Sequence, residues 1–249
     1  MERECVESTR LDFPALTARK HAKTYVGTLD GERVVVKVLN TLRPTAEIRS
    51  TASRLAGMSD GSLVRVVAFQ VYPPALCTEY CARWSLSDTR EMVPQRFTTR
   101  LALEVARDIL GGLAHLHHAG VVHARFYPSN VLLTAEFRAK LADPAFSVFS
   151  TPLTLCSAAQ AVFLPDEVLN NNAQPRSDVF SWALVTYFAL TGAPPQRSGT
   201  SPPASVHCDD GEVEMVLNEC IARDVTARPD VAGLQEEVGY LLAAHTHGT

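Results

Sequence analysis

Strand-forming and helix-forming segments are segregated along this chain of 249 residues. Apolar, β-branched runs at 23–29 and 32–39 flank Asp30-Gly31, a pair typical of a tight β-hairpin. By contrast, residues 98–120 carry apolar side chains at helical spacing and end in a glycine. A strand-rich first part followed by a helix-rich second part, with a boundary near 80–84, predicts an α+β architecture, or two lobes with a cleft between them.

The remaining segments follow the same division. Residues 45–58 predict one helix, and 62–72 and 74–81 predict further strands, so we expect a first sheet of about five strands. In the second part, helices are expected at 84–92, 177–192, 211–224 and 230–244, and loops at 146–163 and 193–210. The segment 177–192 is apolar on nearly every face, which predicts a buried helix. The tail 245–249 is expected to fray.

Composition narrows the classes of partner. The formal net charge is -4, so there is no basic excess that would indicate nucleic acid or an anionic membrane surface. No apolar run approaches the roughly 20 residues that span a bilayer, and the polar N-terminus lacks the apolar core of a secretory signal. The six cysteines form no CxxC pair, which argues against a metal cluster or a disulfide framework. We therefore expect reduced thiols in a cytoplasmic protein.

One stretch, 121–147, carries the residues of a possible reaction centre. A loop begins at His123, Asn130 follows, a short apolar strand comes next, and Asp143 closes the unit. Further motifs stand around it in a definite order. They are VVVK at 34–37, CTEYC at 77–81, HARFYPSN at 123–130, DPA at 143–145, PDEVL at 165–169, SDVFSWAL at 177–184 and ARP at 227–229.

Taken in this order, the motifs resemble those of the eukaryotic protein-kinase domain, from about residue 16 to residue 242. The resemblance implies one bilobal domain covering 1–249. Its parts would be a small N-lobe of five strands and one helix at 1–80, a hinge at 81–85, and a larger, mainly helical C-lobe at 86–249.

The resemblance also implies roles for single residues. Lys37 would be the phosphate-binding lysine with Glu47 as its helix partner, and Thr78 would be the gatekeeper. Asn130 and Asp143 would hold Mg²⁺, although capping of loops is an equally good reading of these two. The residues expected in a degenerate nucleotide cleft are Lys37, Glu47, Thr78, Glu79, Cys81 and Leu132.

Other matched positions are structural in the family. His123 is expected to be a buried core histidine, and Asp178 to accept backbone hydrogen bonds from the loop that begins there. Glu167 and Arg228 would form a buried ion pair, in which removal of one partner is costly.

The chain differs from the family at positions that bind the nucleotide or take part in the reaction. The glycines of the phosphate-binding loop should fall at 17, 19 and 22, where the chain has Thr17, Arg19 and Ala22. Val35 replaces the alanine that caps the adenine ring, and the larger side chain would narrow that pocket. Arg125 replaces the catalytic aspartate, and a guanidinium stays protonated, so it cannot serve as a base.

Two further replacements follow in the same stretch. Tyr127 stands in place of a lysine that would neutralise the transferring phosphate. Pro144 replaces the phenylalanine after the metal-binding aspartate, and a proline there predicts an extended backbone at Asp143.

These departures predict a catalytically impaired kinase-like domain, a pseudokinase, that acts as a signalling scaffold or an allosteric protein-interaction module. Such a domain requires no cofactor, binds ATP and Mg²⁺ weakly at most, and has a protein partner, for which an active kinase is the analogy. The alternatives are a divergent active kinase, or an ATP- and Mg²⁺-binding switch, using Lys37, Asn130 and Asp143. An active enzyme would need another carboxylate, such as Glu136, as its base.

Overall fold

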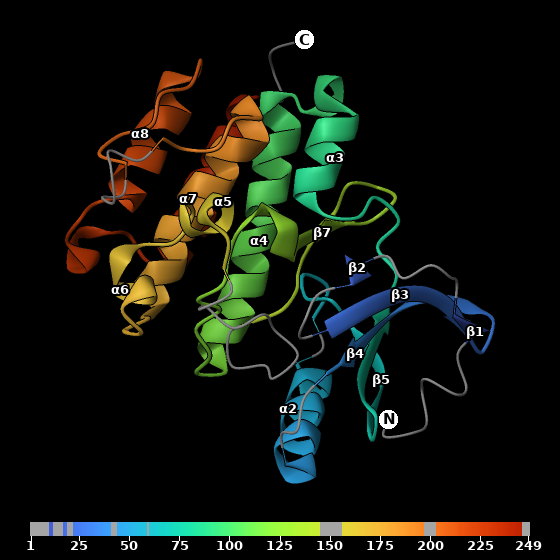
Figure 1. Ribbon diagram of the computed structural model, residues 1–249. Coiled ribbons are helices and arrows are strands. Elements are labelled where there is room, and N and C mark those ends of the chain that lie inside the picture. Colours follow the sequence, from blue (N-terminus) through green and yellow to red (C-terminus); the bar gives the residue numbers. More distant parts are fainter. Residues whose placement is uncertain are drawn as a thin grey trace.

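The protein is described by a computed structural model that covers residues 22–40, 44–58, 60–144, 156–196 and 203–245, together with the backbone of 10–11 and 17–18. A β-sheet with one flanking helix is followed by a group of helices on the other side of a connecting segment (Figure 1). The predicted bilobal α+β fold is thereby confirmed. Arg19 and the tail 246–249 lie outside the described residues.

Within the described residues, the sheet of the N-lobe has six strands rather than the expected five. Its order is β1-β3-β4-β6-β5, and β2 also pairs with β3. The strands are β1 Arg10–Leu11, β2 Thr17–Ala18, β3 Ala22–Leu29, β4 Glu32–Leu39, β5 Val66–Val71 and β6 Pro74–Glu79. The β3–β4 turn has φ of 52° at Asp30 and 86° at Gly31, the left-handed conformation that a tight hairpin requires.

One helix, α2 (Thr45–Gly57), covers a face of this sheet (Figure 1). Ile48 and Ala52 are fully buried on its inner side and pack with Phe69 of β5 and Leu76 of β6. Because these residues are spaced four apart on the helix, they form a single apolar stripe toward the sheet.

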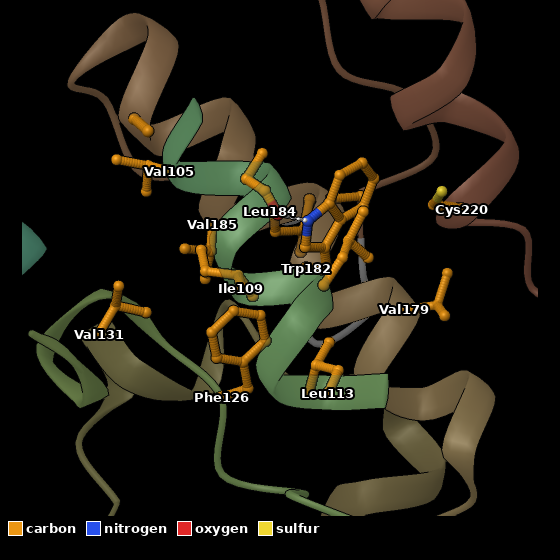
Figure 2. Packing of buried hydrophobic residues seen from close by; sticks show 14 of the residues in the cluster. Val105, Ile109, Leu113, Phe126, Val131, Val179, Trp182, Leu184, Val185 and Cys220 are labelled. Carbon is orange, nitrogen blue, oxygen red and sulfur yellow. Dashed lines mark hydrogen bonds between the residues drawn. The ribbon is translucent and has the colours of Figure 1, made fainter. Parts of the chain in front are cut away.

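The core of the C-lobe is built on two helices, α4 (Thr99–His118) and α7 (Pro175–Thr191). The predicted burial of α7 is confirmed, since Trp182 is 1% exposed and its indole nitrogen donates to the carbonyl of Ala106 at 3.0 Å. Figure 2 shows Trp182 and Val185 packed against α4, with Phe126 pointing toward Ile109.

The other C-lobe elements surround this pair (Figure 1). They are α3 Leu86–Met92, β7 Val131–Leu133, β8 Ala139–Leu141, α5 Ala158–Ala161, α6 Asp166–Leu169, α8 Gly211–Cys220 and α9 Val231–Ala244. The helix α5 lies inside a segment predicted to be a loop. Ser157 caps it by accepting from the Gln160 amide at 3.3 Å, and the Gln160 side chain accepts in return from the Ser157 amide.

Backbone hydrogen bonds form two seams with the C-lobe, one from the N-lobe at 62–64 and one from the connecting segment at 83–84. In the first, the amide of Val64 donates to the carbonyl of Leu141 at 2.9 Å, and the Leu141 amide donates to Ser62 at 2.8 Å. In the second, Leu133 accepts from Arg83 at 3.1 Å and donates to Trp84 at 2.8 Å. The first seam passes so close to α4 that a Cβ on Gly112 would lie 2.9 Å from the Ser62 carbonyl oxygen.

Every helix in the described part of the chain is too short or too polar to cross a membrane.

Candidate nucleotide-binding site

A cavity of about 530 Å³ lies between the sheet and the helical lobe. Its volume is within the roughly 300–1,000 Å³ common for small-molecule sites. From the N-lobe side it is lined by Ala22, Thr24, Val35, Lys37, Leu55, Leu76 and Thr78, and from the other side by Cys81, Trp84, His123, Tyr127, Asn130, Leu132 and Asp143, among others. Val35 and Pro144 contribute to the wall, but they leave the cavity open.

Lys37 reaches into this cavity from the centre of the sheet. It lies in β4 between Thr24 of β3 and Leu76 of β6, so its backbone is held on both sides. The ammonium group donates to Oδ2 of Asp143 at 2.5 Å, and the two side chains are 17% and 30% exposed.

No described contact joins Lys37 to Glu47, so the predicted pairing of these two residues stays a prediction. Glu47 lies in the first turn of α2, whereas the α2 residue that lines the cavity near its other end is Leu55. Eight helical residues separate the two by about 12 Å along the axis. The carboxylate that meets Lys37 is that of Asp143 instead.

The predicted extended backbone at Asp143 is wrong. Its φ is 57°, in the left-handed region that aspartate tolerates better than most residues. Its neighbour Ala142 is fixed on both sides, because its amide donates to Asn130 at 2.9 Å and its carbonyl lies 3.0 Å from Nε2 of His123. Together with the ion pair to Lys37, these contacts override the local preference that Pro144 imposes.

Residues of β6, of the segment after it and of β7 form one wall of the cavity. Thr78, Cys81 and Leu132 line it. The Glu79 carboxylate points elsewhere, since it accepts from the Arg65 amide at 2.7 Å and pairs with Lys140 at 2.7 Å. Burial, with a smaller contribution from the nearby Glu79 carboxylate, raises the pKa of the Cys81 thiol to about 11, so this thiol stays protonated at neutral pH.

The loop that begins at His123 is fixed by one buried carboxylate. Asp178 accepts from the amides of His123 and Ala124, both at 2.8 Å, and contacts Nε2 of His117 at 2.8 Å. Ala124 has a φ of 54°, so these bonds hold the loop in a conformation that alanine rarely adopts. The loop and Asp178 therefore meet as the sequence predicted.

His123 itself is fully buried, and burial lowers the pKa of its imidazole. With Nε2 placed to donate to the Ala142 carbonyl, Nδ1 can accept from the Arg125 amide at 3.3 Å. Both ring nitrogens of a neutral imidazole are thus used, as expected for a core histidine.

Arg125 occupies the position of the expected base, and its side chain is only 2% exposed. Its carbonyl accepts from Nδ2 of Asn130 at 2.9 Å. In the guanidinium, however, Nε and Nη2 are buried and have no hydrogen-bond partner among the described residues. Tyr127 lies beside it, also 2% exposed. Burial raises the pKa of the Tyr127 phenol, and a side-chain hydrogen bond with Arg125, together with the Arg125 charge, opposes that rise.

The carboxylates that line the cavity, within the described ranges, are Asp88 and Asp143. Asp143 is paired with Lys37, and Asp88 accepts from the Ser85 hydroxyl at 2.5 Å at the start of α3. Glu136 lies exposed in the turn between β7 and β8, outside the cavity lining. Among the residues that the structure describes, no substitute carboxylate therefore lies at the place that Arg125 occupies.

Two buried guanidinium donors without described partners are costly, which leads to a stability prediction. Replacing Arg125 by methionine is expected to raise the free energy of unfolding by about 1–3 kcal/mol, because buried donors without partners are removed at similar side-chain volume. Urea denaturation measures the change. The matched control is Arg138→Met, which breaks the bonds of 2.7 and 2.6 Å to the buried Asp108 and should destabilise the protein. Equal destabilisation by both variants would contradict the prediction.

The remaining predicted pair, Glu167 and Arg228, lies in the C-lobe. Arg228 is 2% exposed and donates to Oε1 of Glu167 at 2.6 Å, to the Ala222 carbonyl at 2.8 Å and to the Arg176 carbonyl at 3.1 Å. Glu167 and Arg228 therefore form the ion pair that the sequence predicted. It ties α6 to the segment before α9.

Comparison with known proteins decides the family. The sequence pattern of the protein kinase domain matches residues 22–236. The chain belongs to the protein kinase family.

Three of the relatives are named as serine/threonine-protein kinases or as protein kinases, each from a different organism. The domain is 24% identical over 247 residues to a probable serine/threonine-protein kinase of Dictyostelium discoideum, covering 88% of this chain and 18% of that protein. It is 24% identical over 246 residues to the Arabidopsis thaliana kinase STY17, covering 89% of this chain and 43% of STY17. Over 115 residues, 43% of this chain and 28% of the relative, it is 38% identical to PknL of Mycobacterium tuberculosis. The chain thus spans less than half the length of each.

The residues of the kinase domain fit a nucleotide. The cavity is open, Lys37 supplies a cation, and Asn130 and Asp143 offer the oxygen ligands that Mg²⁺ prefers. A bound Mg²⁺ would supply charge neutralisation on the phosphates. At the glycine positions, Ala22 adds a buried Cβ to the cavity wall, while the side chains at 17 and 19 lie outside the described residues.

Proposed function

We propose that this kinase domain does not transfer phosphate and acts as a scaffold or allosteric module that binds another protein. The observation that carries the proposal is Arg125, a buried guanidinium where phosphoryl transfer needs a carboxylate to orient the substrate hydroxyl and accept its proton. Tyr127 adds to it, because a buried neutral phenol replaces a positive charge beside the transferring group.

The contacts that hold the fold support the same reading. Asp178 anchors the catalytic loop, and Arg228 and Glu167 form their ion pair, although the loop carries no base. A domain that retains its architecture without its chemistry suits a role in which surfaces matter. Another protein, with an active kinase as the class suggested by analogy, is the partner that we propose.

A transfer assay tests the proposal. Purified protein incubated with radiolabelled ATP, Mg²⁺ and generic protein substrates is expected to incorporate no more phosphate than the Lys37→Ala variant, in itself or in the substrates. Lys37→Ala is the control for contaminating kinases, because it removes the cation of the cavity and leaves Arg125 in place. Robust incorporation of labelled phosphate that is abolished in Lys37→Ala would contradict the proposal.

A nucleotide-binding switch without transfer is the second candidate, and the open cavity favours it. Lys37, Asn130 and Asp143 all line a space large enough for a nucleotide. The signature of such a switch is a melting temperature that rises with nucleotide concentration in a preparation without transfer activity, because a ligand that binds only the folded state stabilises it by mass action.

A further inference from the structure

The end of helix α9 is bound to the start of helix α8 through one histidine. His245, which follows the last residue of α9, places Nδ1 2.8 Å from the Leu241 carbonyl oxygen and Nε2 2.7 Å from Oδ2 of Asp210. Asp210 precedes α8 and uses its other oxygen, Oδ1, to accept from the amides of Glu212 and Val213, both at 3.1 Å. One carboxylate therefore caps α8 and holds the end of α9 at the same time.

Both ring nitrogens of His245 face atoms that only accept hydrogen bonds. A neutral imidazole carries one N–H and one lone pair, so it can donate to the carbonyl or to the ionised carboxylate but not to both. Only the protonated ring, which has two N–H groups, makes both bonds. The buried His123 differs, because its Nδ1 faces an amide donor. The contacts of His245 thus require a positive charge on its imidazole.

The charges on α8 favour the same protonated form. The hydrogen bond to the Leu241 carbonyl, and after it the contact with Asp210, raise the pKa of the His245 imidazole above its usual 6.5 and outweigh the effect of partial burial. The carboxylate of Glu212, one turn into α8, acts in the same direction. His245 is therefore a histidine that two carboxylates of a neighbouring helix keep charged.

The other helix that packs against α9 is α4. Most of its titratable side chains are paired elsewhere, Arg100 with Glu104 at 3.0 Å, Asp108 with Arg138 at 2.6 Å, His115 with Asp60 at 4.0 Å and His117 with Asp178 at 2.8 Å. No described contact joins the remaining two, Arg107 and His118, to His245. The proton that matters at the end of α9 is therefore the one that His245 shares with Asp210.

We propose that His245 and Asp210 form a pH-sensitive contact, which holds the end of α9 on the first turn of α8 while the imidazole is protonated and opens when that proton passes to solvent. The cap on α8 survives the opening, because it uses Oδ1 alone. The last turn of α9 then frays. It contains Leu241 and Leu242, which are 4% and 8% exposed while the contact is closed, so opening presents apolar surface at this end of the C-lobe.

The direction of the response follows from the raised pKa of His245. A group whose pKa is higher in the folded than in the unfolded state stabilises the fold fully below the unfolded value, and this contribution is lost as the pH rises through the folded value. The contact is therefore closed below about pH 6.5 and opens above it. Unperturbed carboxyl and ammonium side chains keep their charge through this range.

Amide hydrogen exchange along α9 in the full chain tests the inference. NMR measures it at about pH 5.5 and about pH 8.5, and protection factors remove the intrinsic pH dependence of exchange. The protection of amides 242–245 is expected to fall about tenfold or more between the two values, as for the loss of a charge-assisted hydrogen bond. Amides 234–238, in the middle of α9, should keep their protection. The His245 ring protons should titrate with a midpoint above about pH 6.5.

Three variants assign the change to the contact. His245→Gln cannot be charged, so protection at 242–245 should not depend on pH. Asp210→Asn keeps the cap on α8, since asparagine caps helices as well as aspartate does, but it offers the imidazolium no anion. Protection at the end of α9 should then no longer fall as the pH rises. His207→Gln is the control, because His207 pairs with Glu214 at 3.1 Å beside the same helix and is 79% exposed, and the response of α9 should match the wild type.

Several results would overturn the inference. They are equal protection of amides 242–245 at both pH values in the wild type, the same fall in His245→Gln, or a ring titration of His245 with a midpoint at or below about pH 6.5. Loss of protection along the whole of α9 would overturn it too, because the C-lobe would then be unfolding as a unit. The transfer of labelled phosphate has no part in any of these measurements.

Discussion

Replacing Arg228 by alanine is expected to lower the free energy of unfolding by about 3–5 kcal/mol, the usual effect of removing one partner of a buried ion pair. The variant leaves the Glu167 carboxylate and the carbonyls of Ala222 and Arg176 without the donor that they share. Urea denaturation at neutral pH measures the loss.

The control for this variant is Arg100→Ala. Arg100 pairs with Glu104 at 3.0 Å on the surface of α4, and such pairs contribute about 0.5 kcal/mol or less. The two variants remove the same side chain from opposite environments. A similar small effect for both would show that the Glu167–Arg228 pair does not hold the C-lobe together.

The stability difference between wild type and Arg228→Ala should depend on pH in a defined direction. Burial raises the pKa of Glu167, but hydrogen bonds, above all from Arg228, outweigh burial and hold the pKa below its usual 4.5. A depressed pKa means that the carboxylate stabilises the folded state above the unfolded pKa, and that this contribution is lost as the pH falls through the folded value. The difference between wild type and Arg228→Ala should therefore be full at pH 7 and shrink only below about pH 4.5.

Asp178→Ala is expected to cost about 3 kcal/mol or more, because hydrogen bonds to charged groups contribute about 1.5–3 kcal/mol each. The fully buried carboxylate of Asp178 accepts from the amides of His123 and Ala124. Among the described hydrogen bonds, the one to Asp178 is what holds Ala124 at its left-handed φ. Hydrogen exchange should accelerate at these two amides before the rest of the C-lobe opens.

Asp230→Ala is the matched control for Asp178. Asp230 caps α9 at the surface by accepting from the Gly233 amide at 2.9 Å, and loss of such a cap costs about 1 kcal/mol. Its exchange effect should stay within the first turn of α9. Protection at His123 and Ala124 that survives in Asp178→Ala would contradict the anchoring role of this carboxylate.

Much of the fold followed from local sequence signals. Asp30-Gly31 between two β-branched runs fixed the β3–β4 hairpin, and its strands begin and end where expected, within one residue. The apolar segment 177–192 proved to be the buried helix α7. The strands β1 and β2 were missed because two-residue segments carry no alternation that a pattern could reveal. The helix α5 did leave a signal, the capping pair of Ser157 and Gln160, which was overlooked.

The sequence predicted which residues line the cavity better than it predicted which of them are in contact. Lys37, Asn130 and Asp143 were placed in one cavity by the order of motifs, and the structure brings them together. The pairing of Lys37 with Asp143 was not predicted, and the position of Glu47 depends on where α2 lies along its axis, which sequence spacing around a variable loop does not fix. The burial of Arg125 depends on residues distant in sequence, so nothing local reveals it.

The two seams restrict how the cavity can open. One joins 62–64 to Leu141, and the other joins the connecting segment at 83–84 to Leu133. Because the second seam ties the connecting segment to the C-lobe, only the first ties the N-lobe to it directly. The N-lobe should therefore move about the contact at 62–64 while the chain bends between Glu79 and Arg83. Slow hydrogen exchange at the amides of Val64, Arg83, Leu133 and Leu141 would mark the bonds that stay closed during this motion.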